Sequence, residues 1–255
     1  MDFFLKRFRQ HPPKIPSPKY PHGTVFKADF EAGLGNQLLV FQKTACLAVA
    51  SKGFVVTPVL FHCDKTEARV YCDPTNTFPL SDMVTINARL DAIVSSRVPT
   101  QTIKLAYYQP DYCYPGNAFA FPDLVRFSPK VVAYGESLRP QCPSPCLVVQ
   151  YRTGRDWEHH KESSINKKRV DAAVQRYKTS GCVLLTPEST RGLLPCARVR
   201  HASNTSQPLR FFGELYIAAT ANVFVYNRHS TTYHVVRRMS GPTLKLVSLQ
   251  SRVPH

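Results

Sequence analysis

Three short segments of this 255-residue sequence carry polar groups suited to binding a phosphate or a sugar. They read GLGNQ at 33–37, QYRTGRDW at 150–157 and NRHSTTY at 227–233. The first and third stand where a helix is predicted to begin, and a helix N-terminus presents free backbone N–H groups to an anion. The second carries an arginine, whose planar fork matches a phosphate. Each follows an apolar run, and α/β sheets bind ligands beyond the carboxyl ends of their strands. The sequence therefore predicts one anion site built from three distant loops.

Asn36, in the first segment, has two interpretations. It precedes an apolar run that is typical of a helix, and asparagine is a favoured N-cap residue. Its neutral amide can also donate and accept hydrogen bonds beside a bound phosphate. The sequence is compatible with both roles, a structural cap and a ligand contact.

The three segments lie within an alternation of predicted strands and helices. Apolar runs typical of strands occupy 24–30, 54–61, 146–151, 182–187, 222–227 and 243–249, with a basic strand at 196–202. Helices are predicted at 36–53, 165–181, 209–221 and 231–241, and a short one within 81–96. This alternation is typical of α/β proteins whose parallel sheets are covered by helices on both faces. We expect two α/β halves, at 24–140 and 141–255, after an extended, basic and proline-rich lead-in at 1–23.

The formal net charge of +16 favours an anionic partner. Nucleic acid, a membrane surface and a phosphorylated small molecule all qualify. The basic residues are spread along the chain and no nucleic-acid motif accompanies them, so nucleic-acid binding is the less favoured alternative. Residues 1–9 mix phenylalanine with lysine and arginine, a composition suited to weak contact with an anionic membrane surface.

The eight cysteines lack the paired spacing of a zinc site. A disulfide between Cys142 and Cys146 and a set of buried free thiols are both compatible with the sequence, so the redox compartment stays open. Asn204-Thr205-Ser206 matches the N-glycosylation triplet, which also occurs by chance. No run reaches the ~20 apolar residues of a membrane span, and no signal peptide is recognisable. We expect a cytoplasmic protein unless the N-terminus is truncated.

Taken together, the motifs resemble those of the GDP-fucose-dependent fucosyltransferases, and most closely the protein O-fucosyltransferases. The matching stretches are GLGNQ with its apolar helix, VVQYRTGRDW, and GELYIAATANVFVYNRHSTTYHVVRR, in the family's order. The family reads Gly-x-x-Gly-Asn-Gln, then His-x-Arg-x-Gly, then an Asp-Leu-Tyr helix followed by a strand and a Ser-Ser/Thr turn. The resemblance implies a GT-B-like α/β fold, in which two Rossmann-like halves with parallel sheets enclose a cleft for the donor.

The resemblance also implies roles for particular residues. Arg152 matches the arginine that grips the donor diphosphate, and Asn36 matches the residue that lines the reaction centre, so these two are the expected catalytic residues. Glu214 stands where the family has an aspartate that contacts the nucleotide. The full expected donor-binding set is Gly33, Leu34, Gly35, Asn36, Gln150, Arg152, Asp156, Glu214, Ser230, Thr231 and Thr232.

Three positions depart from the family pattern. Gln150 replaces the family histidine, Thr232 replaces an aromatic residue, and Tyr226 replaces a glycine. A glutamine preserves a hydrogen bond but cannot transfer a proton, so a catalytically weakened GDP-sugar-binding protein is the alternative function.

The implied reaction moves fucose from GDP-fucose to a hydroxyl of a protein or glycan acceptor. Negative charge grows on the leaving diphosphate, and an arginine with a helix N-terminus stabilises such charge without a metal. The sequence has no Asp-x-Asp motif. We therefore expect inverting, metal-independent transfer with no cofactor.

Overall fold

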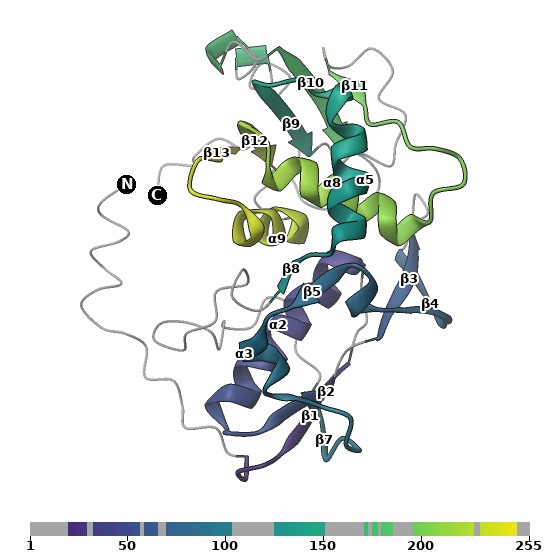
Figure 1. The fold of residues 1–255 in the computed structure, drawn as a ribbon, viewed down its shortest axis with the longest axis vertical. Helices are drawn as coiled ribbons and strands as arrows, with labels where there is room; N and C mark the ends of the chain where they lie inside the picture. Colours follow the sequence, from purple (N-terminus) through teal and green to yellow (C-terminus); the bar gives the residue numbers. More distant parts are fainter. Residues whose placement is uncertain are drawn as a thin grey trace, which may run out of the picture.

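The computed structural model describes residues 20–29, 33–56, 59–65, 70–103, 125–150, 171–172, 175–177, 180–185, 196–226 and 230–248. Two parallel sheets dominate it: a four-stranded sheet with the order β6-β2-β1-β7 and a five-stranded sheet with the order β11-β10-β9-β12-β13. In Figure 1 the five-stranded sheet occupies the upper part of the molecule and the four-stranded sheet the lower part. The predicted α/β class with parallel sheets is confirmed.

The four-stranded sheet is built around one long helix. Its strands are β1 (Val25–Ala28), β2 (Phe54–Val56), β6 (Val94–Ser95) and β7 (Gln101–Ile103), and the helix is α2 (Leu34–Ala50). α2 is buried on almost every side because it packs against β1, β2 and the neighbouring hairpin, and against a helix of the other half. The predicted strand at 54–61 is wrong as a single element, since β2 ends at Val56 and a separate strand begins at Val59.

Antiparallel elements connect the two parallel sheets. β3 (Val59–Lys65) pairs with β4 (Val70–Pro79), and β5 (Val84–Ile86) pairs with β8 (Val125–Phe127). A 3₁₀ turn covers Leu80–Asp82, and α3 (Ala88–Asp91) is the short helix predicted within 81–96. These antiparallel pairs were not predicted, because β5 and β8 have only three residues each and the long β4 is largely polar.

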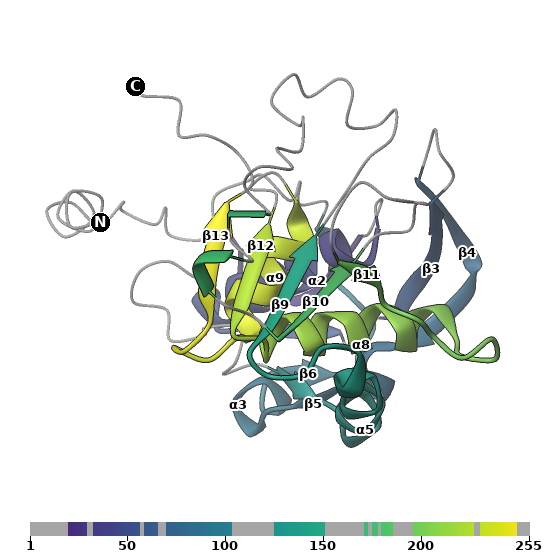
Figure 2. The same cartoon turned by 90° about the horizontal axis from the view of Figure 1, so that it is seen from above.

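The five-stranded sheet follows the predicted strands closely. Its strands are β9 (Cys146–Gln150), β10 (Gly181–Leu185), β11 (Ala197–Arg198), β12 (Val223–Tyr226) and β13 (Lys245–Ser248), and its helices are α8 (Gln207–Ala219) and α9 (Thr231–Met239). Figure 2 shows the strands from above in their spatial order. Every residue of the central β9 is buried, as expected for a strand covered on both faces.

Helix α5 (Pro129–Leu138) packs closely along α8. Two glycines permit this approach. A Cβ added at Gly213 would lie 2.5 Å from the ring of Tyr134, and one added at Gly135 would collide with the ring of Tyr216. The Tyr216 ring of α8 therefore packs on the backbone of α5 at Gly135, and the Tyr134 ring of α5 packs on the backbone of α8 at Gly213. Both rings lie between the two helices.

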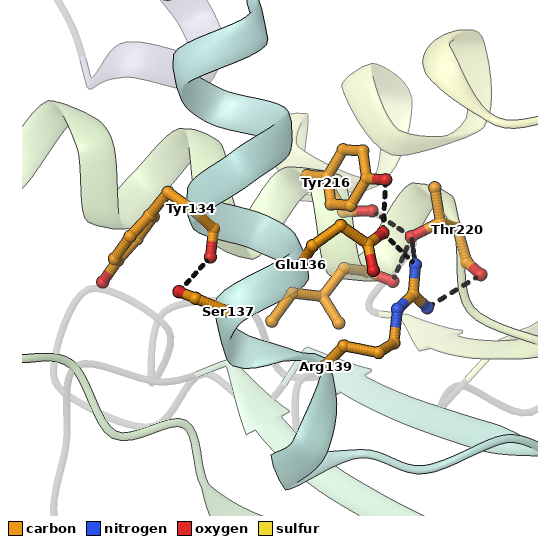
Figure 3. A network of polar contacts seen from close by, with 7 residues as sticks. Tyr134, Glu136, Ser137, Arg139, Tyr216 and Thr220 are labelled. Carbon is orange, nitrogen blue, oxygen red and sulfur yellow. Dashed lines mark hydrogen bonds and ion pairs between the residues drawn. The ribbon is translucent and has the colours of Figure 1, made fainter.

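A polar network closes one end of this helix pair (Figure 3). The Tyr216 hydroxyl donates to the Glu136 carboxylate at 2.5 Å, and the Arg139 guanidinium donates to Glu136 at 3.2 Å and to the Thr220 hydroxyl at 2.8 Å. The hydrogen bond from Tyr216, followed by that from Arg139, lowers the pKa of Glu136. Burial, and then the Glu136 carboxylate, raise the pKa of Tyr216.

One hydrophobic cluster contains residues of both parallel sheets and of the helices between them. α2, which packs on the four-stranded sheet, also packs against α9, and Arg238 of α9 donates to the side-chain oxygen of Gln42 on α2. The Nδ1 atom of His62, on β3, lies 3.3 Å from the side-chain oxygen of Gln207, the first residue of α8. These contacts hold the two sheets in a defined arrangement.

Disulfides replace the free thiols that the sequence also allowed. Cys142 is bonded to Cys146, with their Cα atoms 5.2 Å apart, and Cys182 is bonded to Cys196, with Cα atoms 4.7 Å apart. Cys46 is disulfide-bonded as well. Among the described residues no cysteine is free, so of the two alternatives that the sequence left open the Cys142–Cys146 disulfide is confirmed and buried free thiols are wrong for this part of the chain. Within the same residues, no helix is both long and apolar enough to cross a membrane.

Candidate functional site

The GLGNQ segment forms the first turn of α2. The helix begins at Leu34 with Gly33 as its N-cap residue, and the backbone N–H of Asn36 donates to the Gly33 carbonyl at 2.8 Å. Asn36 is therefore the third residue of the helix, and no side-chain hydrogen bond caps this end. The prediction that the helix starts at Asn36 is wrong by two residues, and the capping role fails with it.

The side chain of Asn36 has an unusual environment for an amide. Its Oδ1 atom is buried, and no hydrogen-bond partner for it exists among the described residues. Buried polar atoms nearly always have a partner, and an unpaired one costs about 1–3 kcal/mol. An atom in this state at a helix N-terminus is suited to accept a hydrogen bond from a ligand or an ordered water.

The neighbouring Gln37 has a structural role instead. Its side chain accepts from the Phe61 backbone N–H at 2.9 Å and donates to the Phe61 carbonyl at 3.2 Å. The amide thus pairs with β3 as another strand would, at the position where the register of the β3–β4 pair shifts. The two adjacent residues therefore differ in role: Gln37 fixes the β3–β4 hairpin, while Asn36 Oδ1 has no partner among the described residues.

Two predicted donor-binding residues of the other half are in direct contact. Gln150 is the last residue of β9, and Ser230 precedes α9 as its N-cap residue. The Gln150 amide donates to the Ser230 hydroxyl at 2.5 Å, and the two side chains are only 3% and 0% exposed. The carboxyl end of the central strand is therefore tied to the N-terminus of a helix, as expected for a ligand-binding edge.

The contact between Gln150 and Ser230 leaves the Gln150 Oε1 atom and the N-terminus of α9 without a side-chain partner among the described residues. Gln150 Oε1 is buried and has no partner among the described residues, the same condition as Asn36 Oδ1. The Ser230 hydroxyl accepts the hydrogen bond from Gln150 and makes no capping hydrogen bond to α9. Since a helix N-terminus carries a partial positive charge, the start of α9 can attract an anion. Thr232 is half-buried in this first turn.

Tyr226 fills the position where the family has glycine. Its ring stacks on that of Tyr233, with centroids 3.7 Å apart and planes inclined by 6°. Burial, and then the Tyr233 hydroxyl, raise the pKa of Tyr226 to about 12. The stack joins the end of β12 to α9, the helix whose N-cap residue is Ser230.

Glu214 belongs to a hydrogen-bonded network of three side chains, with His201 and Tyr134, that the sequence did not predict. Its Oε1 atom lies 2.8 Å from Nε2 of His201, and Nδ1 of His201 lies 2.6 Å from the hydroxyl of Tyr134. A carboxylate only accepts, so Nε2 of His201 is the donor to Glu214, and Nδ1 is the ring nitrogen that faces the Tyr134 hydroxyl. No sequence signal could have found this network, since Tyr134 lies 67 residues from His201.

Several expected site residues lie outside the described part of the chain. They are Arg152 and Asp156, and also residues 1–9, for which a membrane contact was expected. The side chain of Thr231 is likewise not described. The structure thus brings Gln150 and Ser230 together and places Asn36 on α2, the helix that packs against α9. Within the described ranges, no group of three or more His, Cys, Asp or Glu side chains could hold a metal ion.

No protein-family model and no curated protein matches this sequence. Among solved structures, the chain is similar to apo POFUT1 in its first crystal form, with a TM-score of 0.55, 12% identity, and coverage of 90% of this chain and 98% of that one. For POFUT1 in complex with GDP-fucose the TM-score is 0.54 at 12% identity, with coverage of 91% and 99%. Fucosyltransferase NodZ from Bradyrhizobium gives 0.49 at 12% identity, with coverage of 87% and 93%.

This similarity concerns the fold. This chain shares the overall fold of POFUT1, which confirms the predicted GT-B-like α/β fold.

Proposed function

We propose that this protein is a glycosyltransferase that moves fucose from GDP-fucose to a hydroxyl of a protein or glycan acceptor. The observation that carries the proposal is the fold shared with POFUT1, which has been crystallised with GDP-fucose. The motif resemblance and the contact between Gln150 and Ser230 at the carboxyl edge of the five-stranded sheet support it.

The proposed chemistry needs a site that stabilises negative charge. When the bond between the anomeric carbon and the diphosphate breaks, charge develops on the β-phosphate. In our proposal the N-terminus of α9, the Asn36 amide and the Arg152 guanidinium bind this diphosphate, and preorganised groups of this kind stabilise a transition state strongly. Glu214, held by His201, contacts the nucleotide. Gly33, Leu34, Gly35, Asp156, Thr231 and Thr232 complete the donor site.

We further propose that transfer inverts the anomeric carbon and needs no metal ion. Helix N-termini and an arginine supply the positive charge that a cation would otherwise provide. The side chain of Gln150, at the end of β9, cannot take up a proton at neutral pH. The proton of the acceptor hydroxyl is therefore transferred to a group other than residue 150.

The direct test measures hydrolysis and transfer across a panel of GDP- and UDP-sugars, with and without excess EDTA. The proposal expects turnover of GDP-fucose, little turnover of UDP-sugars, and no loss in EDTA. Preference for a UDP-sugar would contradict the donor assignment. Loss in EDTA with recovery in Mn²⁺ would contradict metal-independent transfer.

One observation favours a second candidate function. The Gln150 side chain is buried and already bonded to Ser230, at the position where the family has histidine. A protein that binds GDP-sugars without turning them over would have these features. Two measurements distinguish such a binding protein from an active transferase. A binding protein would bind GDP in calorimetry but would release no GDP from GDP-fucose, with or without candidate acceptors.

A further inference from the structure

Asn204 opens the only Asn-x-Ser/Thr triplet in the 255 residues, and its middle residue, Thr205, is not proline. The triplet lies in a turn between β11 and α8, on the second half of the chain. Asn204 is exposed, and its side chain makes no hydrogen bond to any described residue. An acceptor asparagine must be reachable in this way, because the glycan is added to a surface loop.

The turn has a defined conformation. The Thr205 N–H donates to the Ala202 carbonyl at 3.1 Å. The Arg210 guanidinium, from the first turn of α8, donates to the Ser203 carbonyl at 3.0 Å and to the Ala202 carbonyl at 3.3 Å. The backbone before Asn204 is therefore anchored, while the Asn204 side chain is exposed.

The third residue of the triplet is also available. Ser206 occupies the N-cap position of α8, yet its exposed side chain makes no capping hydrogen bond. At this position serine normally satisfies an N–H of the first turn. Its hydroxyl is therefore not engaged by α8 and is exposed to the enzyme that reads the triplet.

The disulfides give an independent indication of the compartment. All five cysteines whose bonding is described, Cys46, Cys142, Cys146, Cys182 and Cys196, are disulfide-bonded. Disulfides of this number form and persist in oxidising compartments and are rare in the cytosol. N-linked glycans are attached in the same oxidising environment of secreted proteins.

We infer that Asn204 is an N-glycosylation site and that the protein folds in an oxidising compartment. The Asn204 amide nitrogen Nδ2 forms a bond to C1 of the first sugar of a lipid-linked oligosaccharide diphosphate. The C1–O bond to the diphosphate breaks, the lipid diphosphate leaves with the electron pair, and Nδ2 loses one proton. No oxidant or reductant takes part. This inference is independent of the proposed transferase activity.

The test routes the full chain into the secretory pathway of a eukaryotic cell behind a cleavable leader. The whole membrane-enclosed pool is digested with trypsin, so that retained and secreted molecules are both counted. The peptide 201–210, released by cleavage after Arg200 and Arg210, carries Asn204. Treatment with a glycan-removing amidase in heavy-oxygen water marks a formerly glycosylated Asn204 as labelled aspartate.

Two variants of Ser206 provide matched controls. Ser206→Ala should abolish the label and Ser206→Thr should retain it, while alkylation of free thiols shows the same disulfide content in both. Labelled Asn204 in the native chain and in Ser206→Thr, but not in Ser206→Ala, supports the inference. Unlabelled Asn204 in the disulfide-bonded native chain would overturn the glycosylation site. Free thiols at all five cysteines would overturn the compartment.

Discussion

The side-chain amide of Gln150 donates a hydrogen bond to the hydroxyl of Ser230, 80 residues further along the chain. It joins the end of the central strand to the start of α9 and occupies the hydroxyl that would otherwise cap that helix. The two residues therefore act as one unit, and a change at either position alters the other.

Double-mutant analysis tests this coupling. Ser230→Ala leaves the buried Gln150 amide without its acceptor, and Gln150→Leu leaves the serine without its donor. Each variant should lower the free energy of unfolding by about 1–3 kcal/mol, measured by urea denaturation without reductant. The double variant should lose less than the sum, with a coupling of about 0.5–3 kcal/mol. Additive losses would show that the two side chains do not interact in solution.

Asn36→Ser separates a ligand contact from a structural role. The Asn36 Oδ1 atom has no protein partner among the described residues, so a shorter side chain removes no protein hydrogen bond there and should preserve the melting temperature. Turnover of GDP-fucose should fall on the order of 10²-fold, as expected when a group that stabilises developing charge is removed.

Ser128→Ala is the matched control for Asn36. The Ser128 hydroxyl accepts from the Val131 N–H at 3.3 Å and caps α5. Its loss should cost about 0.5–2 kcal/mol of stability and leave turnover of the folded protein unchanged. If Asn36→Ser instead lowers stability and keeps turnover, Asn36 is structural.

Gln37→Leu should destabilise the protein without changing its donor preference. The substitution removes both hydrogen bonds to the Phe61 backbone and should lower the free energy of unfolding by about 1–3 kcal/mol. The same substitution at the exposed Gln101 of β7 should change it by no more than about 0.5 kcal/mol. Equal effects at the two positions would mean that Gln37 does not hold β3.

The elements that sequence could predict are those whose burial follows a simple period. β9, β12 and α8 are apolar along their whole length or along one face, and their limits agree with prediction to within about two residues. The 54–61 strand was wrong because two apolar stretches, separated by Thr57 and Pro58, were read as one element, and their partners differ: β1 for β2 and β4 for β3. Pairing is a long-range property that a local pattern does not contain.

The candidate site divides in the same way. Motif resemblance pointed to Gln150 and Ser230, and the structure joins them. The same resemblance named Asn36 as a site residue and gave no role to the adjacent Gln37. Only the fold shows that Gln37 lies against Phe61. The partner of Glu214 depends on a loop that returns His201 to α8, which no spacing rule describes.

The stacked tyrosines predict a change in alkaline stability. Tyr226 has a pKa of about 12 in the folded protein, raised from 10.0 by burial and by Tyr233. Between about pH 10 and pH 12 the unfolded chain loses this proton while the folded protein keeps it. Stability should therefore fall as pH rises through this window. The free energy of unfolding, measured by urea denaturation at several pH values, should fall less in Tyr226→Phe than in the native protein above pH 10. Below pH 10 the plots of stability against pH for the two proteins should run parallel. Identical slopes above pH 10 would contradict the stack.

Calorimetric titration of the native protein with GDP and with UDP, both in EDTA, tests the donor assignment most directly. The proposed site recognises a guanosine diphosphate through Glu214, the Gln150–Ser230 edge and the N-terminus of α9. We predict saturable binding of GDP and at least about tenfold weaker binding of UDP, a difference of about 1.4 kcal/mol. Equal affinity for the two nucleotides, or no binding of GDP, would contradict the assignment of this protein as a GDP-fucose-dependent transferase.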